Sequence, residues 1–423
     1  QGRKNKLAKY NITLDKIQKS LEAYLETKRQ AFPRFYFLSN DELLEILAQV
    51  RDPHAVQPHL QKIFDCIQHL GFGEKPGSID IVSMRSPEKE VVPLGKNLKA
   101  RGNVEDWLMA VQDRMQKVLH DCLKEATLDY ERRPRVEWIV EGGHPGQCVA
   151  TAAQIMWSRR TEEVLRAADT IQGGMKKWED ENIKMVLDLV VKVRGKLSRI
   201  VRKILVALIT TDVHAKDMIV EMRKGNVDRV NNFAWEQQLR YYWDATEDDC
   251  IIRHANAKLY YCYEYMGCTS RLVITPLTDK CWLTITGAIH LKLGASPAGP
   301  AGTGKTESSK DLAKAMGTFC IVFNCSDQID YIMIGKLFAG LAQCGCWCCL
   351  DEFNRILIEV LSVVAQQLLV LRTGMKSGVE RINFEGRNIA LKSHCVIVTM
   401  NPGYAGRTAL PDNLKICFRP VAM

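Results

Sequence analysis

The stretch Gly299-Pro-Ala-Gly-Thr-Gly-Lys-Thr306 decides the fold, because it matches a complete phosphate-binding loop. Its glycines let the backbone wrap closely around a phosphate, and the amides that open the following helix point at the anion. Lys305 is expected to reach the β- and γ-phosphates of ATP, and the Thr306 hydroxyl is expected to ligate Mg²⁺. The predicted nucleotide site at this loop comprises Gly299, Pro300, Ala301, Gly302, Thr303, Gly304, Lys305 and Thr306.

An acidic pair follows an apolar stretch further along the chain. Residues 346–350 are typical of a buried strand, and Asp351 and Glu352 come directly after it. Such a strand would carry both carboxylates to a sheet edge beside the phosphate-binding loop, as in a Walker B element. We expect Asp351 to hold Mg²⁺ and Glu352 to polarise the attacking water as general base. A solvated strand end is the alternative interpretation of this acidic pair. The functional interpretation is favoured because the stretch between Lys305 and Asp351 leaves room for a strand and a helix between the two motifs.

A third strand tip carries an amide. Residues 396–399 form a short apolar run, and Asn401 follows it. An amide at this place can hydrogen-bond the γ-phosphate and the lytic water, the role called sensor I in AAA+ ATPases, although an Asn-Pro turn alone is unremarkable. The order Lys/Thr, Asp/Glu and Asn favours an AAA+ ATPase over a kinase or a GTPase. The predicted catalytic residues are Lys305, Glu352 and Asn401, and the predicted magnesium ligands are Thr306 and Asp351.

The second half of the chain alternates between strand and helix patterns after about residue 245. Helices of ordinary length between the strands imply a mostly parallel sheet covered on both faces, a three-layer α/β/α module. The predicted strands cover residues 271–275, 319–324, 346–350 and 395–399, and the predicted helices cover 306–316, 331–341 and 356–371.

The first 240 or so residues show mainly helical periodicity, which we expect to run to about Trp243. Ser39 and Glu42 form a capping box in front of an apolar run. Gly and Pro punctuate two β-rich runs at 79–84 and 90–94, which predicts a hairpin inserted in the helical array. The expected domains are therefore a mainly helical region, residues 1–243, and an ATPase module, residues 244–423.

Composition limits the class of protein. The chain has 423 residues, of which 46% are hydrophobic and 25% charged, as in a soluble protein of two or three domains. No uncharged apolar run approaches the ~18 residues of a membrane span, so no membrane contact is expected. The net charge of +9 suits an acidic partner. Much of the excess of positive charge lies at residues 184–203, however, where helical spacing predicts one amphipathic helix with a solvated basic face. We therefore expect no nucleic-acid partner.

Fifteen cysteines are scattered along the chain. In a long chain with a nucleotide motif they are typical of reduced cytosolic thiols rather than of a disulfide framework. Cys344, Cys346, Cys348 and Cys349 form the densest group, which could mark a zinc site. The group lies within an apolar run and no second Cys/His pair follows at finger spacing, so small buried side chains on a core strand are favoured.

The wording around these motifs is specific to one family. The stretches 272–279 (LVITPLTD), 297–306 (PAGPAGTGKT), 351–355 (DEFNR), 401–407 (NPGYAGR) and 410–414 (LPDNL) resemble the first AAA module of dynein heavy chains. Upstream, 30–44 (QAFPRFYFLSNDELL) and 238–243 (QLRYYW) resemble the dynein linker, so the match covers nearly the whole chain. Two more stretches, 323–328 (FNCSDQ) and 359–367 (EVLSVVAQQ), look closer to axonemal inner-arm heavy chains than to the cytoplasmic form.

The resemblance implies that the module hydrolyses the ATP that drives a stroke, with the linker as the lever that bends and straightens. It also implies that residues 374–388 form an insertion facing the linker. The chain departs from the usual family residues at Cys346, Cys348, Leu350 and Ala409, but none of these is a phosphate-binding position. The residues that the resemblance places in the adenine pocket are Leu272, Val273 and Ile274.

By the same comparison we expect a fragment, because the chain opens without Met and stops soon after the third strand tip. A fragment without its helical lid, the arginine finger of the next module and the stalk would hydrolyse ATP very slowly or not at all. The implied partners are the remaining AAA+ modules, a microtubule and dynein intermediate and light chains, in the cytoplasm and cytoskeleton and in the axoneme of a cilium or flagellum. The alternatives are a truncated, non-catalytic binding or assembly piece and another AAA+ remodelling ATPase.

Overall fold

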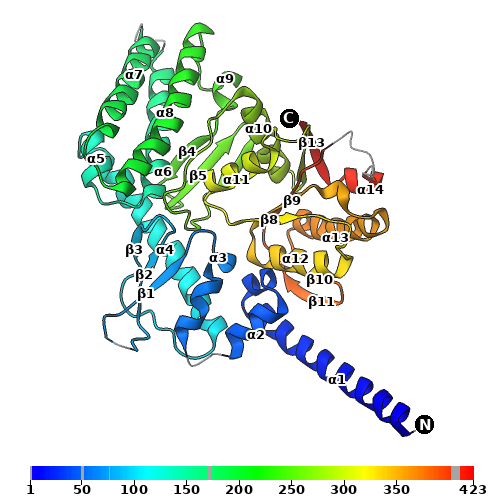
Figure 1. Cartoon of the computed structure of the whole chain (residues 1–423). Helices are drawn as coiled ribbons and strands as arrows, with labels where there is room; N and C mark the ends of the chain where they lie inside the picture. The colour runs from blue at the N-terminus through cyan, green and yellow to red at the C-terminus, as the bar shows by residue number, and fades with distance from the viewer. Residues whose placement is uncertain (1, 49–51, 76, 169–172, 402–409) are drawn as a thin grey trace.

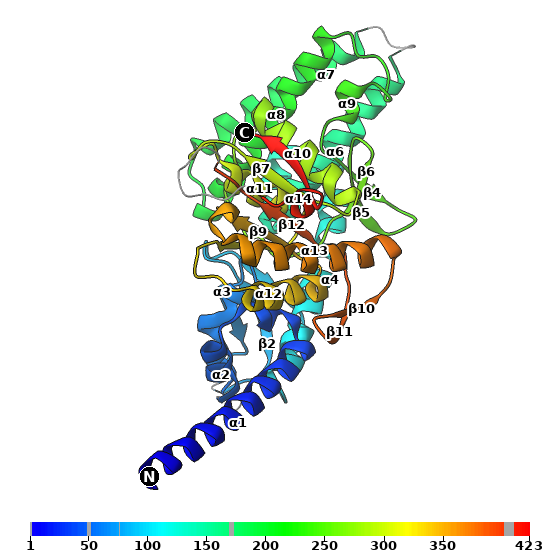
Figure 2. The same ribbon diagram turned by 90° about the vertical axis from the view of Figure 1, so that its right-hand side faces the viewer.

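The computed structural model describes residues 2–48, 52–75, 77–168, 173–401 and 410–423. Figures 1 and 2 show a helical N-terminal part and an α/β part packed side by side, with the first helix projecting from the body. The predicted order is confirmed: a helical region with small antiparallel sheets precedes a parallel-sheet module.

The helical region keeps the predicted capping box at its second helix. The Ser39 N–H donates to the Glu42 carboxylate at 2.9 Å, and the Glu42 N–H donates to the Ser39 hydroxyl at 3.2 Å. The elements of this region are α1 (Gly2–Ala31), η1 (Pro33–Phe37), α2 (Asn40–Ala48), η2 (Pro53–His59), α3 (Leu60–Ile63), α4 (Val104–Tyr130), α5 (Arg135–Glu141), α6 (Gly146–Arg166), α7 (Gly174–Val193), α8 (Arg199–Lys224) and α9 (Phe233–Glu236).

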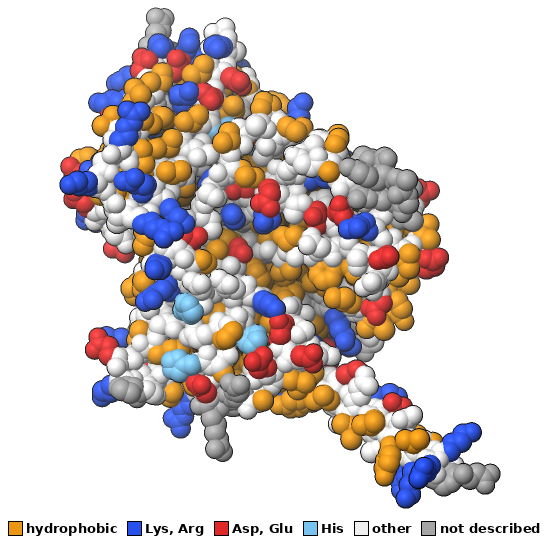
Figure 3. All heavy atoms as spheres, in the orientation of Figure 1, with side chains coloured by type: hydrophobic (Ala, Val, Ile, Leu, Met, Phe, Trp, Pro, Cys, Tyr) orange, Lys and Arg blue, Asp and Glu red, His pale blue; other side chains and the backbone are white. Residues whose placement is uncertain are grey.

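Two helical predictions need comment. The basic segment 184–203 is not one helix, because α7 ends at Val193 and the Ser198 hydroxyl caps a new helix, α8, by accepting from the Val201 N–H. The helix predicted around residues 12–25 is present as α1, but its apolar stripe is largely exposed, whereas Leu25 is buried. Figure 3 shows these apolar side chains along the projecting helix.

Two small antiparallel sheets interrupt the helices in the described part of the chain. The predicted hairpin is confirmed as β2 (Ile81–Arg85) and β3 (Val91–Pro93), with β1 (His69–Phe72) added at its edge. The prediction of helix up to Trp243 is wrong, because Tyr241, Tyr242 and Trp243 favour a strand. They lie in β4 (Arg240–Asp244), which pairs with β5 (Asp249–His254), followed by β6 (Ala257–Tyr260). The expected domain boundary at 243/244 falls within β4.

The module contains a parallel sheet in the order β13-β7-β12-β9-β8, counted over the described residues. Side chains alternate across it: Trp347 and Cys349 of β9 join the core shared with the helical region, whereas Cys348 and Leu350 join a second core. Both faces are therefore buried, as predicted for a three-layer module. Its strands are β7 (Gly294–Ala298), β8 (Cys320–Asn324), β9 (Trp347–Asp351), β12 (Cys395–Val398) and β13 (Phe418–Ala422).

Helices cover the two faces in pairs. On one side α10 (Pro276–His290) and α11 (Lys305–Ala315) share a core with the helical region, and on the other α12 (Tyr331–Cys344) and α13 (Ile358–Ser377) pack together. By length and composition alone α13 could cross a membrane, but it packs here as a core helix of the module. The remaining elements are η3 (Phe353–Arg355), the hairpin β10 (Arg381–Phe384) and β11 (Arg387–Ala390), and α14 (Asp412–Lys415).

The strand predicted at residues 271–275 is wrong. This segment is an extended loop that leads into α10, with the Thr275 side chain capping the helix and Pro276 as its first residue. The strand that leads into the phosphate-binding loop is instead β7, and neither β7 nor β13 was predicted.

A shared core joins the helical region to the module. One hydrophobic cluster runs from Leu25 through the helical region to Ile397 of β12. We call the surface where the helical region packs against the module the seam, and Arg34 pairs across it. Its two terminal nitrogens donate to the two Glu264 oxygens at 2.8 and 2.6 Å, and both side chains are buried. Arg387 of β11 donates to Glu26 of α1 at 2.7 Å, so the predicted insertion at 374–388 does border the helical region.

Candidate active site

The phosphate-binding loop joins β7 to α11. Gly302 and Gly304 have φ of 82° and 81°, a conformation that only glycine adopts without strain, and Gly304 caps α11. Among the described residues, no heavy atom lies within 4 Å of the position where a Cβ of Gly302 would be. The loop thus places the N-terminal amides of α11 toward a space that an anion can enter.

Lys305 begins α11 and is nearly buried, with 6% of its surface exposed. Its ammonium donates to the carbonyl oxygens of Gly299 and Pro300 at 3.0 and 2.6 Å. The two carbonyl oxygens accept hydrogen bonds from the ammonium, as phosphate oxygens would. The Lys305 side chain therefore lies along its own loop. The ammonium is thus held at the loop that is predicted to bind the phosphates.

The Asp351 carboxylate ends β9 beside the loop. Its Oδ1 accepts hydrogen bonds from the Thr306 hydroxyl at 2.6 Å and from the Thr399 hydroxyl at 2.5 Å. Three strand and loop tips thus meet at one carboxylate, as expected at the carboxyl edge of a parallel sheet. Thr399 has no place in the sequence-based prediction.

Glu352 lies next to this group with a left-handed backbone, φ 53° and ψ 42°. Its Oε1 accepts from the Asn401 amide at 3.1 Å, and its Oε2 pairs with Arg355 at 2.7 Å. Asn401 is itself buried at 7% exposure. The structure therefore brings Glu352 and Asn401 together, as the order of the motifs predicted, and adds Arg355, which sequence reasoning did not assign.

The oxygen atoms at this edge suit a magnesium ion. Mg²⁺ prefers hard oxygen ligands, commonly one or two carboxylates with waters and substrate phosphates. The Thr306 hydroxyl and the Asp351 carboxylate are 2.6 Å apart and both face the loop that would hold the phosphates. These two residues fit the ion. Burial, with the charges of Asp351 and Glu352, raises the pKa of the nearby Cys325 thiol to about 12, so no thiolate competes there.

The segment expected at the adenine is tied to the phosphate-binding helix. Arg271 Nε and Nη2 donate to the two Asp311 oxygens at 3.0 and 3.2 Å, and the Leu272 N–H donates to Asp311 Oδ1 at 3.4 Å. Burial alone would lower the Arg271 pKa, but the Asp311 charge outweighs it and the pKa is raised. Leu272 and Val273 are exposed at 36% and 75%, so they are accessible to a ligand.

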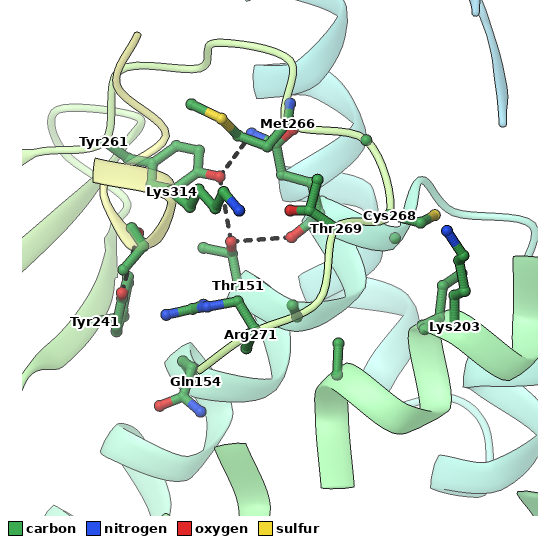
Figure 4. Close-up of a pocket in the computed structure, with 17 residues that line it drawn as sticks. Thr151, Gln154, Lys203, Tyr241, Tyr261, Met266, Cys268, Thr269, Arg271 and Lys314 are labelled. Atoms are coloured by element: carbon green, nitrogen blue, oxygen red, sulfur yellow. Dashed lines mark hydrogen bonds between the residues drawn. The ribbon is translucent and has the colours of Figure 1, made fainter. Parts of the chain in front are cut away.

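Ile274 points elsewhere. It lines a cavity of about 40 Å³ between α6, α8 and α10, together with Trp157, His214 and Trp282. A neighbouring cavity of about 50 Å³, drawn in Figure 4, is lined by Arg271, Lys314, Tyr261 and residues of α6 and α8. Figure 4 also shows Thr151 and Tyr261 joined by a hydrogen bond inside it. Both cavities lie at the seam, and none of residues 299–306 lines either of them.

The cysteine group is structural. Cys346, Cys348 and Cys349 are buried on or beside β9, and burial raises the pKa of each thiol well above its usual value. Among the described residues, no cluster of three or more His, Cys, Asp or Glu side chains is placed to hold a metal ion. The family departure at Ala409 lies outside the described residues, as does the turn that follows Asn401.

Comparison with known families decides which AAA+ proteins the chain resembles. Residues 261–423 match the family described as "Hydrolytic ATP binding site of dynein motor region", and residues 1–126 match "Dynein heavy chain, N-terminal region 2". Human "Dynein axonemal heavy chain 6" is 54% identical over 98% of this chain and 10% of its own length. The chain belongs to the dynein heavy chain family. Its module therefore carries the hydrolytic ATP-binding site of a dynein motor region.

Other relatives are axonemal dyneins too. Mouse "Dynein axonemal heavy chain 1" is 53% identical over 98% of this chain and 10% of its own length. The Chlamydomonas reinhardtii protein "Dynein-1-beta heavy chain, flagellar inner arm I1 complex" is 46% identical over 100% of this chain and 9% of its own length. The chain thus spans about one tenth of the length of these relatives. The resemblance to axonemal heavy chains is confirmed, and a remodelling ATPase outside the dyneins is excluded.

Proposed function

We propose that ATP hydrolysis at this site drives a swing of the helical region, which acts as the linker of a ciliary or flagellar microtubule motor. The observation that carries the proposal is the meeting of Thr306, Asp351, Glu352 and Asn401 at one sheet edge, beside a loop that presents Lys305. This is the set of groups that phosphoryl transfer to water requires: phosphate binding, a metal site, a base and an amide.

The roles of the residues follow from their chemistry. Lys305 binds the β- and γ-phosphates with the loop amides, while Thr306 and Asp351 hold the magnesium ion, which neutralises phosphate charge when bound. The Glu352 carboxylate takes a proton from the attacking water, and the Asn401 amide orients that water against the γ-phosphate. Leu272 and Val273 contact the adenine from the loop that Asp311 anchors, and Ile274 supports that loop from the seam.

The linker role rests on the shared core. We infer a division into a linker, residues 1–243, and an ATPase module, residues 244–423, joined through the Arg34–Glu264 pair and the surrounding apolar side chains. Tyr241 adds a direct link, because its hydroxyl donates to the Ala315 carbonyl at the end of α11. A displacement of the phosphate-binding helix would therefore reach the linker through buried contacts.

The proposed partners are the remaining AAA+ modules of the same heavy chain, dynein intermediate and light chains, and a microtubule reached through a stalk. The proposed location is the cytoplasm and cytoskeleton, in the axoneme of a cilium or flagellum. Support comes from the axonemal and flagellar relatives, whose names place those proteins in such assemblies.

Breaking the seam tests the mechanical role in the complete heavy chain. Glu264→Gln leaves the Arg34 charge buried without its partner, which costs about 3–5 kcal/mol of stability. We expect ATP hydrolysis to remain measurable while microtubule gliding slows much more, because force passes through this seam. Gliding velocity and ATPase rate are measured on the same preparation, with thermal unfolding to confirm that the variant is folded.

A matched control lies within the linker. Arg135 and Asp212 form a similar largely buried pair between α5 and α8 at 2.7 Å, away from the module. Asp212→Asn should lower stability comparably without separating gliding from hydrolysis. Normal gliding by folded Glu264→Gln would show that this seam does not transmit the stroke.

A further inference from the structure

Thr399 fastens the acidic pair to the neighbouring strand. The residue follows β12 directly and is 1% exposed. Its hydroxyl donates to Asp351 Oδ1 at 2.5 Å and accepts from the Glu352 N–H at 3.0 Å. Its backbone adds two bonds, from its N–H to the Leu350 carbonyl and from the Phe353 N–H to its carbonyl, both at 3.0 Å. One residue therefore contacts four consecutive residues across the sheet edge.

The hydroxyl compensates for an unusual backbone. Glu352 has φ 53°, which costs a residue with a side chain roughly 1–3 kcal/mol and persists only where the surroundings enforce it. This turn takes the Glu352 N–H out of the regular ladder, and the Thr399 hydroxyl accepts it. The same turn sends the Glu352 carboxylate toward the Asn401 amide, two residues beyond Thr399.

The Asp351 end of the pair depends on the same atom. Oδ1 receives the hydroxyls of Thr306 and Thr399 together. Thr306 would hold a metal ion through an oxygen lone pair and could still donate its O–H to Asp351, and the Thr399 hydroxyl adds a second donor to the same oxygen from the neighbouring strand. The Thr399 hydroxyl is therefore suited to hold the metal-binding carboxylate in place in the loaded site.

We propose that Thr399 is a positioning residue for ATP hydrolysis, which sets the directions of the Asp351 and Glu352 carboxylates together through its single hydroxyl. This inference rests on the proposed roles of those two carboxylates. The contacts of Thr399 are with the two carboxylate-bearing residues and their neighbours, so it would act through them. Its effect falls on turnover and on magnesium dependence, and the phosphate-binding loop retains its affinity for the nucleotide.

Two substitutions in the complete heavy chain separate the hydroxyl from the shape. Thr399→Val keeps the size and removes both side-chain hydrogen bonds, so kcat should fall about 10- to 100-fold, the range for losing a supporting hydrogen bond behind a metal ligand. The magnesium concentration for half-maximal turnover should rise, and ATP affinity, measured with a fluorescent nucleotide, should change little. Thr399→Ser keeps the hydroxyl and should restore most of the turnover.

Two controls complete the experiment. Thr211→Val removes a buried hydroxyl that, among the described residues, bonds only carbonyls of its own helix, α8, and it should leave kcat unchanged. Glu352→Gln, run in parallel, tests the general base itself: turnover at the wild-type rate would reject the general-base role proposed for Glu352, whatever Thr399 does. A silent Thr399→Val beside an inactive Glu352→Gln would overturn the positioning role alone. Equal losses in the Val and Ser variants would also overturn it, since packing would then explain both.

Discussion

Glu352→Gln in the complete heavy chain is expected to bind ATP normally and to lower the rate of hydrolysis at least about a hundredfold, the lower range for losing a general base. Glutamine keeps the shape and can still bond the Asn401 amide, but it cannot take the proton of the attacking water. The nucleotide should therefore accumulate as ATP on the enzyme. A single-turnover assay that separates bound ATP from bound ADP measures this directly.

The neighbouring carboxylate provides the contrast. Asp351→Asn removes the proposed ligand of the metal ion, so Mg·ATP binding itself should weaken, whereas Glu352→Gln spares it. A distance probe between linker and module should also report one fixed linker position in the trapped Glu352→Gln motor. Wild-type turnover by Glu352→Gln would mean that another carboxylate is the base, with Asp351 the nearest candidate.

Lys305→Ala should weaken ATP binding by roughly 10- to 150-fold, which corresponds to the loss of a charged hydrogen bond worth about 1.5–3 kcal/mol. The ammonium is the proposed ligand of the phosphates, and in the structure it bonds the Gly299 and Pro300 carbonyls. Fluorescent-nucleotide titration gives the affinity. Lys310→Ala is a matched control, since Lys310 lies on the same helix and, within the described part of the chain, forms an ion pair only with Glu307. Unchanged affinity in Lys305→Ala would remove the phosphate-binding assignment.

The motifs predicted the site well because they are local. A phosphate-binding loop needs glycines at fixed places, and two carboxylates after an apolar strand must emerge at the sheet edge. The structure brings Lys305, Thr306, Asp351, Glu352 and Asn401 to one edge, as the sequence predicted. Their chemical roles remain predictions that the substitutions above test.

The sequence did not predict the strand β7, whose residues have low β-propensity. Residues 294–298 read GASPA, with no β-branched or aromatic side chain, yet β7 lies between β13 and β12 in the sheet. Small side chains suit it because Gly294 lies against Phe418, where a Cβ would come within 2.5 Å of the ring. Conversely, residues 271–275 contain Leu, Val and Ile but form a loop, because Asp311 holds Arg271 in place. Asp311 lies 40 residues away in the sequence, so no local pattern could reveal this contact.

Supporting residues were missed for the same reason. Thr399 and Asp311 act through partners 47 and 40 residues away, and nothing in their local sequence marks them. The Arg34–Glu264 pair spans 230 residues and joins regions that the sequence divides. Periodicity predicts which face of an element is buried, but it does not say which element covers it.

We propose that ATP binds at the Gly299–Thr306 loop with its γ-phosphate between Lys305 and Glu352. The most direct test is the structure of the complete heavy chain with a non-hydrolysable ATP analogue and Mg²⁺. We expect the Lys305 ammonium to leave the Gly299 and Pro300 carbonyls for the phosphates, and Mg²⁺ to lie against Thr306 and Asp351. An analogue bound elsewhere, with Lys305 still on those two carbonyls, would contradict it.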